Sequence, residues 1–156
     1  MSNSLGEDIQ NWSVAIRFGL AKPEQWLQFA YRAIGECEEP SPALADLCLA
    51  STNREALELL ADAAREAQFA PPDTDRSSLL LGALSISLEL ERSTPADVLR
   101  QAIEIMIRDE DSQLYGALLD LRPVEYELGS RLLVLLKAFG SEARAAFQQS
   151  GVPLPV

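Results

Sequence analysis

Residues 94–107 read TPADVLRQAIEIMI, and this stretch decides the class of fold. Thr94 belongs to the residue types that cap helices, and Pro95 follows it at the first helical position, where the N–H that proline lacks is not needed. A helix is therefore predicted to begin here. Prolines at 23, 42 and 123 open similar stretches, EQWLQFAYRAI, ALADLCLA and VEYELGSRLLVLLKAF, with Ser41 as a second cap.

Other local signals predict further helices. Thr52 and Glu55 have the spacing of a capping box, Asp75 is placed to cap RSSLLLGALSISLEL, and Gly140 with Ser141 is expected to separate a last helix, EARAAFQQS. Helices are also predicted near residues 5–18, with Ile9, Trp12 and Ile16 on one stripe, and near 112–120. The prediction is an all-α chain with a single domain over residues 1–150, made of about nine antiparallel helices packed as successive hairpins. The arrangement would be HEAT-like or an irregular bundle, followed by an extended, proline-containing tail at 151–156.

One stretch, LSISLELE at 84–91, alternates apolar and polar residues as a strand does. A helix is preferred, because Leu80, Leu84 and Leu88 still form a stripe at helical spacing. No second segment offers itself as a pairing strand, and an isolated strand would leave its backbone groups unpaired.

Aromatic residues concentrate in the first two predicted helices, where core packing is expected. Trp26 and Phe29 share a face, and Trp12 is expected to meet them across the joint. The remaining members of this predicted core group are Phe18 and Tyr31. Tyr115 and Tyr126 are instead candidates for a protein interface.

The charge of the chain limits its partners. The sequence contains 24 Asp and Glu residues and 13 Lys and Arg residues, which gives a formal net charge of -11. Such a field disfavours nucleic acid and anionic membranes and attracts basic macromolecules. No secretory signal and no run long enough for a membrane helix is found, so a cytoplasmic protein is expected, with Cys37 and Cys48 as free thiols.

The acidic residues fall at alternate joints between the predicted helices. If consecutive helices are antiparallel, the even-numbered joints share one edge of the molecule. These joints hold the candidate partner-binding acids, which are Glu36, Glu38 and Glu39; Asp73 and Asp75; and Asp109, Glu110 and Asp111. Tyr115, close to the last of these joints, is the remaining candidate partner-binding residue. Each odd joint carries a base instead. The prediction is an acidic edge that faces a basic partner, and the alternative is a solvated edge that keeps the protein soluble.

Several kinds of catalytic site are excluded by composition. The chain has no histidine, which removes Ser-His and Cys-His catalysis and histidine-containing metal sites. The glycines form no phosphate-binding loop. Asp109 and Asp111 have a D-x-D spacing, but a calcium loop counted from Asp109 would need Gly and Glu where Leu114 and Asp120 stand. No catalytic residue, metal site or cofactor is predicted, and we expect a protein that is not an enzyme.

The first seventy residues resemble a known class of proteins. NWSVAIRFGLAKPEQWLQFAYRAI, followed by SPALADLCLASTNREALELLADAA, is similar to the small helical immunity proteins of bacterial polymorphic toxin and type VI secretion effector systems. The resemblance implies a cytoplasmic inhibitor that binds a cognate toxin domain and blocks its active site. The alternative is a helical-repeat-like adaptor or regulatory scaffold, and a carboxylate metalloenzyme is a third, weaker reading.

Overall fold

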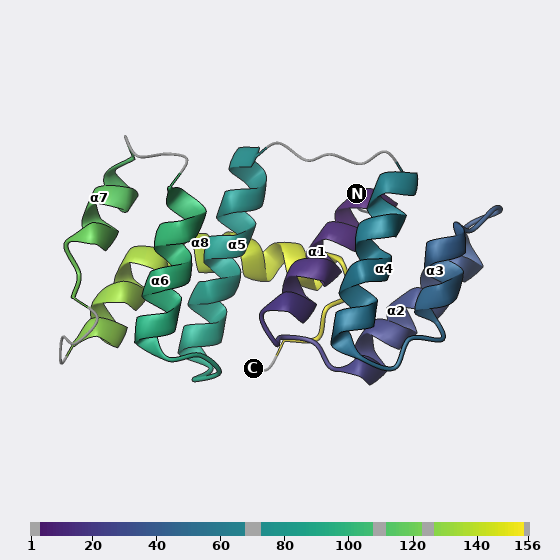
Figure 1. Cartoon of the computed structure of the whole chain (residues 1–156), viewed down its shortest axis with the longest axis horizontal. Coiled ribbons are helices and arrows are strands. Elements are labelled where there is room, and N and C mark those ends of the chain that lie inside the picture. Colours follow the sequence, from purple (N-terminus) through teal and green to yellow (C-terminus); the bar gives the residue numbers. More distant parts are fainter. Residues whose placement is uncertain (1–3, 68–72, 108–111, 123–126, 155–156) are drawn as a thin grey trace. The chain divides into compact units, whose positions relative to one another are not determined.

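The structure, a computed structural model, describes residues 4–67, 73–107, 112–122 and 127–154. Within these ranges the regular secondary structure is entirely helical, which confirms the predicted all-α class (Figure 1). The helices are α1 (Leu5–Arg17), α2 (Pro23–Glu36), α3 (Pro42–Leu47), α4 (Asn53–Glu66), α5 (Asp73–Glu89), α6 (Pro95–Met106), α7 (Gln113–Leu119) and α8 (Leu128–Gln149).

The chain divides into two compact units. Unit 1 consists of Met1–Pro71 together with Ala145–Val156, and unit 2 consists of Pro72–Arg144. The chain thus leaves unit 1 after α4 and returns to it within α8. Unfolding measurements that follow each unit separately would test the expectation of one domain over residues 1–150.

Unit 1 is built around the predicted aromatic cluster. Helix α4 packs against both α1 and α3, and α2 packs against α3. The rings of Trp12 and Phe29 stack with their centroids 5.2 Å apart, as expected across the first joint. Trp26 is fully buried, and its Nε1 donates to Asn53 Oδ1 at 3.0 Å, so its polar edge is satisfied inside the unit.

Side-chain caps start the helices where the sequence predicts. The hydroxyl groups of Ser41 and Thr94 accept hydrogen bonds from the backbone N–H groups three residues later, at 3.2 and 3.3 Å. Thr52 caps α4 in the same way, accepting from Glu55 N at 3.1 Å. The reciprocal half of the predicted capping box is different, because the Glu55 carboxylate accepts from Ser51 N at 3.4 Å and not from Thr52 N.

In unit 2, residues 84–91 belong to a helix and its terminal turn, which confirms the preferred reading. Helix α5 is buried on all sides from Leu79 to Leu88, so its apolar residues surround the axis and leave no single polar face. Helix α6 packs against α5 and α7. The expected cap at Asp75 is wrong, since α5 already begins at Asp73 and Asp75 lies in its first turn.

The predicted break at Gly140 is also wrong, because α8 continues through it to Gln149. A glycine inside a helix costs about 1 kcal/mol relative to alanine, so its presence needs a reason. A Cβ atom at Gly140 would lie 2.6 Å from Ser85 Oγ and 3.2 Å from Ser85 Cβ. Gly140 therefore permits α8 to cross α5 closely. The two helices predicted after residue 123 are one, with residues 123–126 outside the described ranges.

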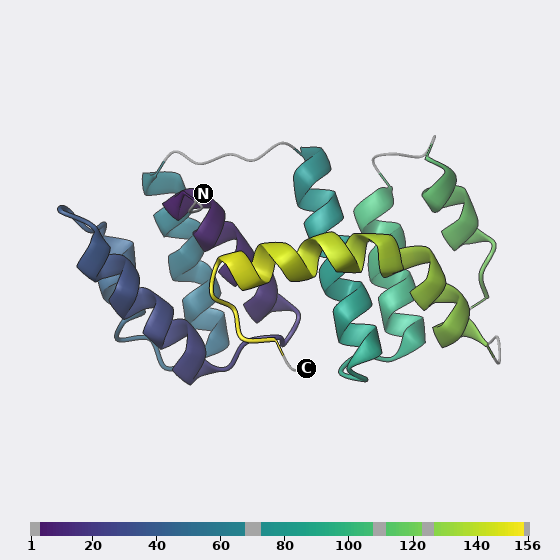
Figure 2. The same ribbon diagram turned by 180° about the vertical axis from the view of Figure 1, so that it is seen from behind.

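The end of α8 is fastened into unit 1 by a polar cluster, here named the C-terminal latch: Asp8, Asn11, Trp12, Arg32 and Ser150. Asn11 Nδ2 donates to Ser150 Oγ at 2.8 Å, and Ser150 Oγ donates to Asp8 Oδ1 at 2.7 Å. Trp12 Nε1 and Arg32 Nη2 donate to the Ser150 carbonyl at 2.9 and 3.1 Å. Figure 2 shows the last turns of α8, in yellow, beside α1.

The predicted tail begins with the closing turn of α8, and its described residues 152–154 have no regular secondary structure. Gly151 forms the terminal turn of α8, Val152 is buried, and Leu154 is half-buried. Val156 lies outside the described residues.

Candidate functional site

The second joint of the chain is an exposed acidic loop. Glu36 is the last residue of α2, and Cys37 leaves the helix in an extended conformation with φ -98° and ψ 133°. Glu38 and Glu39 follow before Pro40, and all three carboxylate side chains are exposed. Among the described residues none of the three has an ion-pair partner. Because the C-terminal end of a helix favours cations, Glu36 gains nothing there from the helix dipole.

Tyr31 extends this acidic loop onto the outer face of α2. Its side chain is 64% exposed, so its assignment to the core group is wrong. The buried face of α2 is formed by Trp26, Phe29, Ala30 and Ala33. Tyr31 lies two residues from Phe29, which places it about 200° away around the helix. That angular offset was the signal in the sequence that could have separated Tyr31 from its aromatic neighbours.

The other predicted partner-binding residues are described only in part. Asp73 and Asp75 lie in the first turn of α5 in unit 2, and their side chains are not described. The stretch 109–111, which holds Asp109, Glu110 and Asp111, lies outside the described residues. Tyr115 in α7 is half-buried, and its backbone N–H donates to Ser112 Oγ at 3.1 Å. The alignment of the three acidic joints along one edge therefore stays a prediction.

Unit 2 contains a surface cavity of about 520 Å³ that the sequence did not indicate. It lies where the turn between α5 and α6 faces the first turns of α8. Leu88, Pro95 and Leu133 supply apolar wall, and the charged residues at its border are Glu89, Glu91 and Arg92. A volume of this size can take a few side chains of a partner segment.

An unusual backbone turn forms the border of this cavity. The N–H of Arg92 donates to the Ser87 carbonyl at 2.9 Å, and the N–H of Glu91 donates to the Leu88 carbonyl at 3.1 Å. This pair of bonds is the Schellman arrangement, which ends a helix with one residue in the left-handed conformation. That residue is Glu91, with φ 57°, and it is the one non-glycine residue with positive φ in the described part of the chain.

Two other helices end in the same arrangement with glycine at the left-handed position. Gly19 closes α1 with φ 72°, and Gly151 closes α8 with φ 82°. Glycine adopts this conformation freely, whereas a residue with a Cβ atom is disfavoured there by about 1–2 kcal/mol. The turn at Glu91 therefore carries backbone strain that the two equivalent turns avoid.

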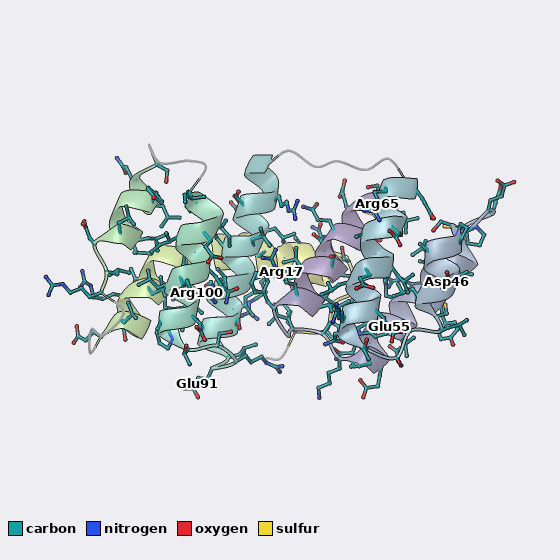
Figure 3. The ribbon with its side chains drawn as sticks, viewed as in Figure 1. Arg17, Asp46, Glu55, Arg65, Glu91 and Arg100 are labelled. Carbon is teal, nitrogen blue, oxygen red and sulfur yellow. The ribbon has the colours of Figure 1, made fainter. Side chains whose placement is uncertain are left out.

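The carboxylates around the cavity differ in their partners. Glu89 forms an ion pair with Arg144, in which Glu89 Oε2 lies 3.2 Å from Arg144 Nη2. Arg92 has an interaction partner of its own. The exposed carboxylate of Glu91 has no hydrogen bond or ion pair within the described ranges. Figure 3 shows Glu91 at the α5–α6 turn, with its side chain directed outward.

Other kinds of site receive little support from the described residues. They include no group of three or more side chains arranged to hold a metal ion. No helix among them is both long and apolar enough to cross a membrane. Cys37 and Cys48 are free thiols, as expected, and burial raises the pKa of the Cys48 thiol.

Comparison of the chain with protein-family models, curated proteins and solved structures finds no match.

Proposed function

We propose that this protein is an immunity protein: a cytoplasmic, stoichiometric inhibitor that binds a cognate bacterial toxin or effector domain. Binding would place an acidic surface over the toxin's active site and so occlude it. The toxin domain would be basic, as is common for proteins that act on nucleic acid. The resemblance of the first seventy residues to immunity proteins of polymorphic toxin and type VI secretion systems supports this class.

The observation that carries the proposal is the loop after α2. Glu36, Glu38 and Glu39 are exposed together, and within the described residues no cation neutralises them. Tyr31 adds an exposed aromatic ring on the same helix, and tyrosine is among the residues that dominate binding energy in protein interfaces. Exposed carboxylates in the loop and an exposed aromatic ring on the preceding helix suit a basic protein surface, and the formal net charge of -11 would accelerate the encounter.

The first experiment is co-purification of a tagged copy from the native host. A stoichiometric basic protein domain in the eluate, whose toxicity the chain neutralises, is the expected result. A large secreted protein with a variable C-terminal domain, encoded directly upstream, would be consistent with it. A partner that is not a toxin would favour the alternative, a non-enzymatic adaptor or regulatory scaffold.

The second experiment tests the acidic loop itself. The double variant Glu38→Lys/Glu39→Lys changes the charge by the same amount as the control Glu58→Lys/Glu66→Lys on α4. Both controls are also exposed. Reversal in the loop should slow association with the toxin about tenfold or more at low salt, because steering depends on where the charge lies. Equal slowing by both pairs would show that only net charge matters, and unchanged association would refute the role of the loop. The same reversal at 109–111 tests whether the third acidic joint contributes.

A further inference from the structure

The turn between α5 and α6 keeps a strained backbone, and no side-chain contact of Glu91 within the described ranges explains it. The left-handed position holds glycine in the equivalent turns at Gly19 and Gly151, but here it holds Glu91. The Glu91 carboxylate makes no hydrogen bond or ion pair among the described residues, and its neighbour Glu89 is engaged by Arg144. The strain is thus associated with a side chain that is left available.

The cavity beside this turn has two kinds of wall. Leu88, Pro95 and Leu133 offer apolar surface, and Glu91 is one of the charged residues that line it. Val134, the residue after Leu133 in α8, is a 75% exposed apolar side chain outside the cavity lining. An apolar wall that ends at a carboxylate matches a long side chain with an aliphatic stem and a cationic head.

The charges around the cavity favour a cation over an anion. The N-terminal end of α6 faces the cavity and is positive by its dipole, but Asp97 in its first turn offsets this. Arg92 has a partner of its own, so it is not a free receptor for an anion. Unit 2 also belongs to a strongly acidic chain. Among cationic side chains, arginine fits best, because its planar group can bind a carboxylate through two N–H donors while its stem packs on apolar atoms.

We infer that this cavity is a docking site for an arginine side chain presented by a partner protein, with Glu91 as the receiving carboxylate. The inference rests on the proposed function, in which the partner is a basic toxin domain. It adds a second contact surface, in unit 2, to the acidic loop of unit 1. Glu91 is exposed and lines the cavity, whereas Glu89 is paired with Arg144.

The test uses the whole chain labelled with ¹⁵N and a short probe, the peptide acetyl-Ala-Arg-Ala-amide, at near-physiological salt. Saturable shifts of the backbone amide signals at 88–94 and 129–133 are expected. The matched peptide with citrulline in place of arginine keeps the shape and loses the charge, so it should bind more weakly. A glutamate peptide should cause no such shifts.

Two variants of the protein complete the test. Glu91→Gln keeps the size and the backbone strain and should weaken arginine binding roughly two- to fivefold, as expected for a partly exposed ion pair. The control Glu142→Gln removes an exposed carboxylate on α8 outside the cavity and should leave the affinity unchanged. Equal effects of both variants, shifts scattered over the whole surface, or localised binding of the glutamate peptide would overturn the inference.

The two proposals can fail separately. If Glu91→Gln leaves toxin binding unchanged and the toxin interface lies elsewhere, the docking site is refuted and the immunity function stays intact. Localised arginine binding by a chain that neutralises no toxin would refute the immunity function and leave the site.

Discussion

Replacing Glu91 by glycine should stabilise the protein, although it removes a side chain. Glu91 holds a left-handed backbone with φ 57° at the end of α5. The two hydrogen bonds that close this turn use only backbone atoms, so Glu91→Gly preserves them. The substitution removes the steric conflict between the Cβ atom and the backbone. It breaks no side-chain interaction, because the Glu91 carboxylate has no partner among the described residues.

The expected magnitude is the difference of two opposing terms. Relief of the left-handed conformation gains about 1–2 kcal/mol. The greater freedom of glycine in the unfolded chain costs about 0.4–1 kcal/mol. The difference spans about 0–1.6 kcal/mol, so the free energy of unfolding should rise by about 0.8 kcal/mol, which corresponds to an increase in melting temperature of about 2–3 °C for a chain of this size.

Urea unfolding followed by two signals measures this effect and its location. Both tryptophans of the chain, Trp12 and Trp26, lie in unit 1, so their fluorescence reports on that unit alone. Far-ultraviolet circular dichroism reports on the helices of both units. If the units unfold together, Glu91→Gly should move both transitions; if they unfold separately, it should move only the transition that fluorescence does not detect.

The matched control is Gly19→Ala, which introduces a Cβ at the equivalent position of α1. Nothing lies within 4 Å of that Cβ, so the change isolates the backbone term. The strain costs about 1–2 kcal/mol and the lower freedom of alanine in the unfolded chain offsets about 0.4–1 kcal/mol of it, so the protein should be destabilised by about 0.8 kcal/mol. Destabilisation by Glu91→Gly, together with the expected loss in Gly19→Ala, would refute the interpretation of Glu91 as a strained residue.

Three further predictions concern other contacts. Gly140→Ala should lower the free energy of unfolding by about 1–3 kcal/mol, because the added Cβ overpacks against Ser85. Adding Ser85→Gly to the same chain should restore part of this free energy. An unchanged free energy of unfolding, measured by circular dichroism, would contradict the close crossing of α5 and α8. Asn11→Ala should cost about 1–3 kcal/mol and shift the fluorescence transition, because a buried acceptor in the latch loses its donor; an unchanged midpoint would argue against the latch. In a Cys37→Ser variant, Cys48 should react with iodoacetamide more slowly in the native protein than in urea near pH 8, because burial raises its thiol pKa; equal rates would contradict this. Burial favours the neutral form of the Cys48 thiol in the native state. The contribution of this thiol to the free energy of unfolding is therefore present below its pKa in the unfolded chain and is lost as the pH rises through its pKa in the native protein.

The helix starts were predictable from the sequence because their causes are local. Thr94 and Ser41 cap helices through a hydroxyl group and an N–H three residues away, and no distant residue is involved. The contact between Trp12 and Phe29 was also accessible, since the short joint at residues 18–22 left few ways to pack the first two helices. These features follow from spacing and short connections.

Two features were missed because distant residues decide them. Gly140 has the local signature of a helix end, but its role depends on Ser85, more than fifty residues earlier. The cavity and the left-handed turn at Glu91 could not be predicted for a related reason. Glutamate gives no local signal for positive φ, and the apolar wall combines residues of α5, α6 and α8. The acidic loop was found, but its exposed neighbour Tyr31 was assigned to the core.

The return of α8 to unit 1 has a consequence for the order of events during synthesis. Trp12 and Asn11 emerge from the ribosome early, but their hydrogen-bond partner Ser150 is translated only after the whole of unit 2, residues 72–144. The N-terminal unit therefore cannot close first, although N-terminal domains usually do during translation. Unit 2 can fold while unit 1 still exposes an unfinished apolar surface. A chaperone that binds nascent chains would meet unit 1 in this open form. A truncated chain that ends before residue 145 would keep unit 1 open, because it lacks Ser150.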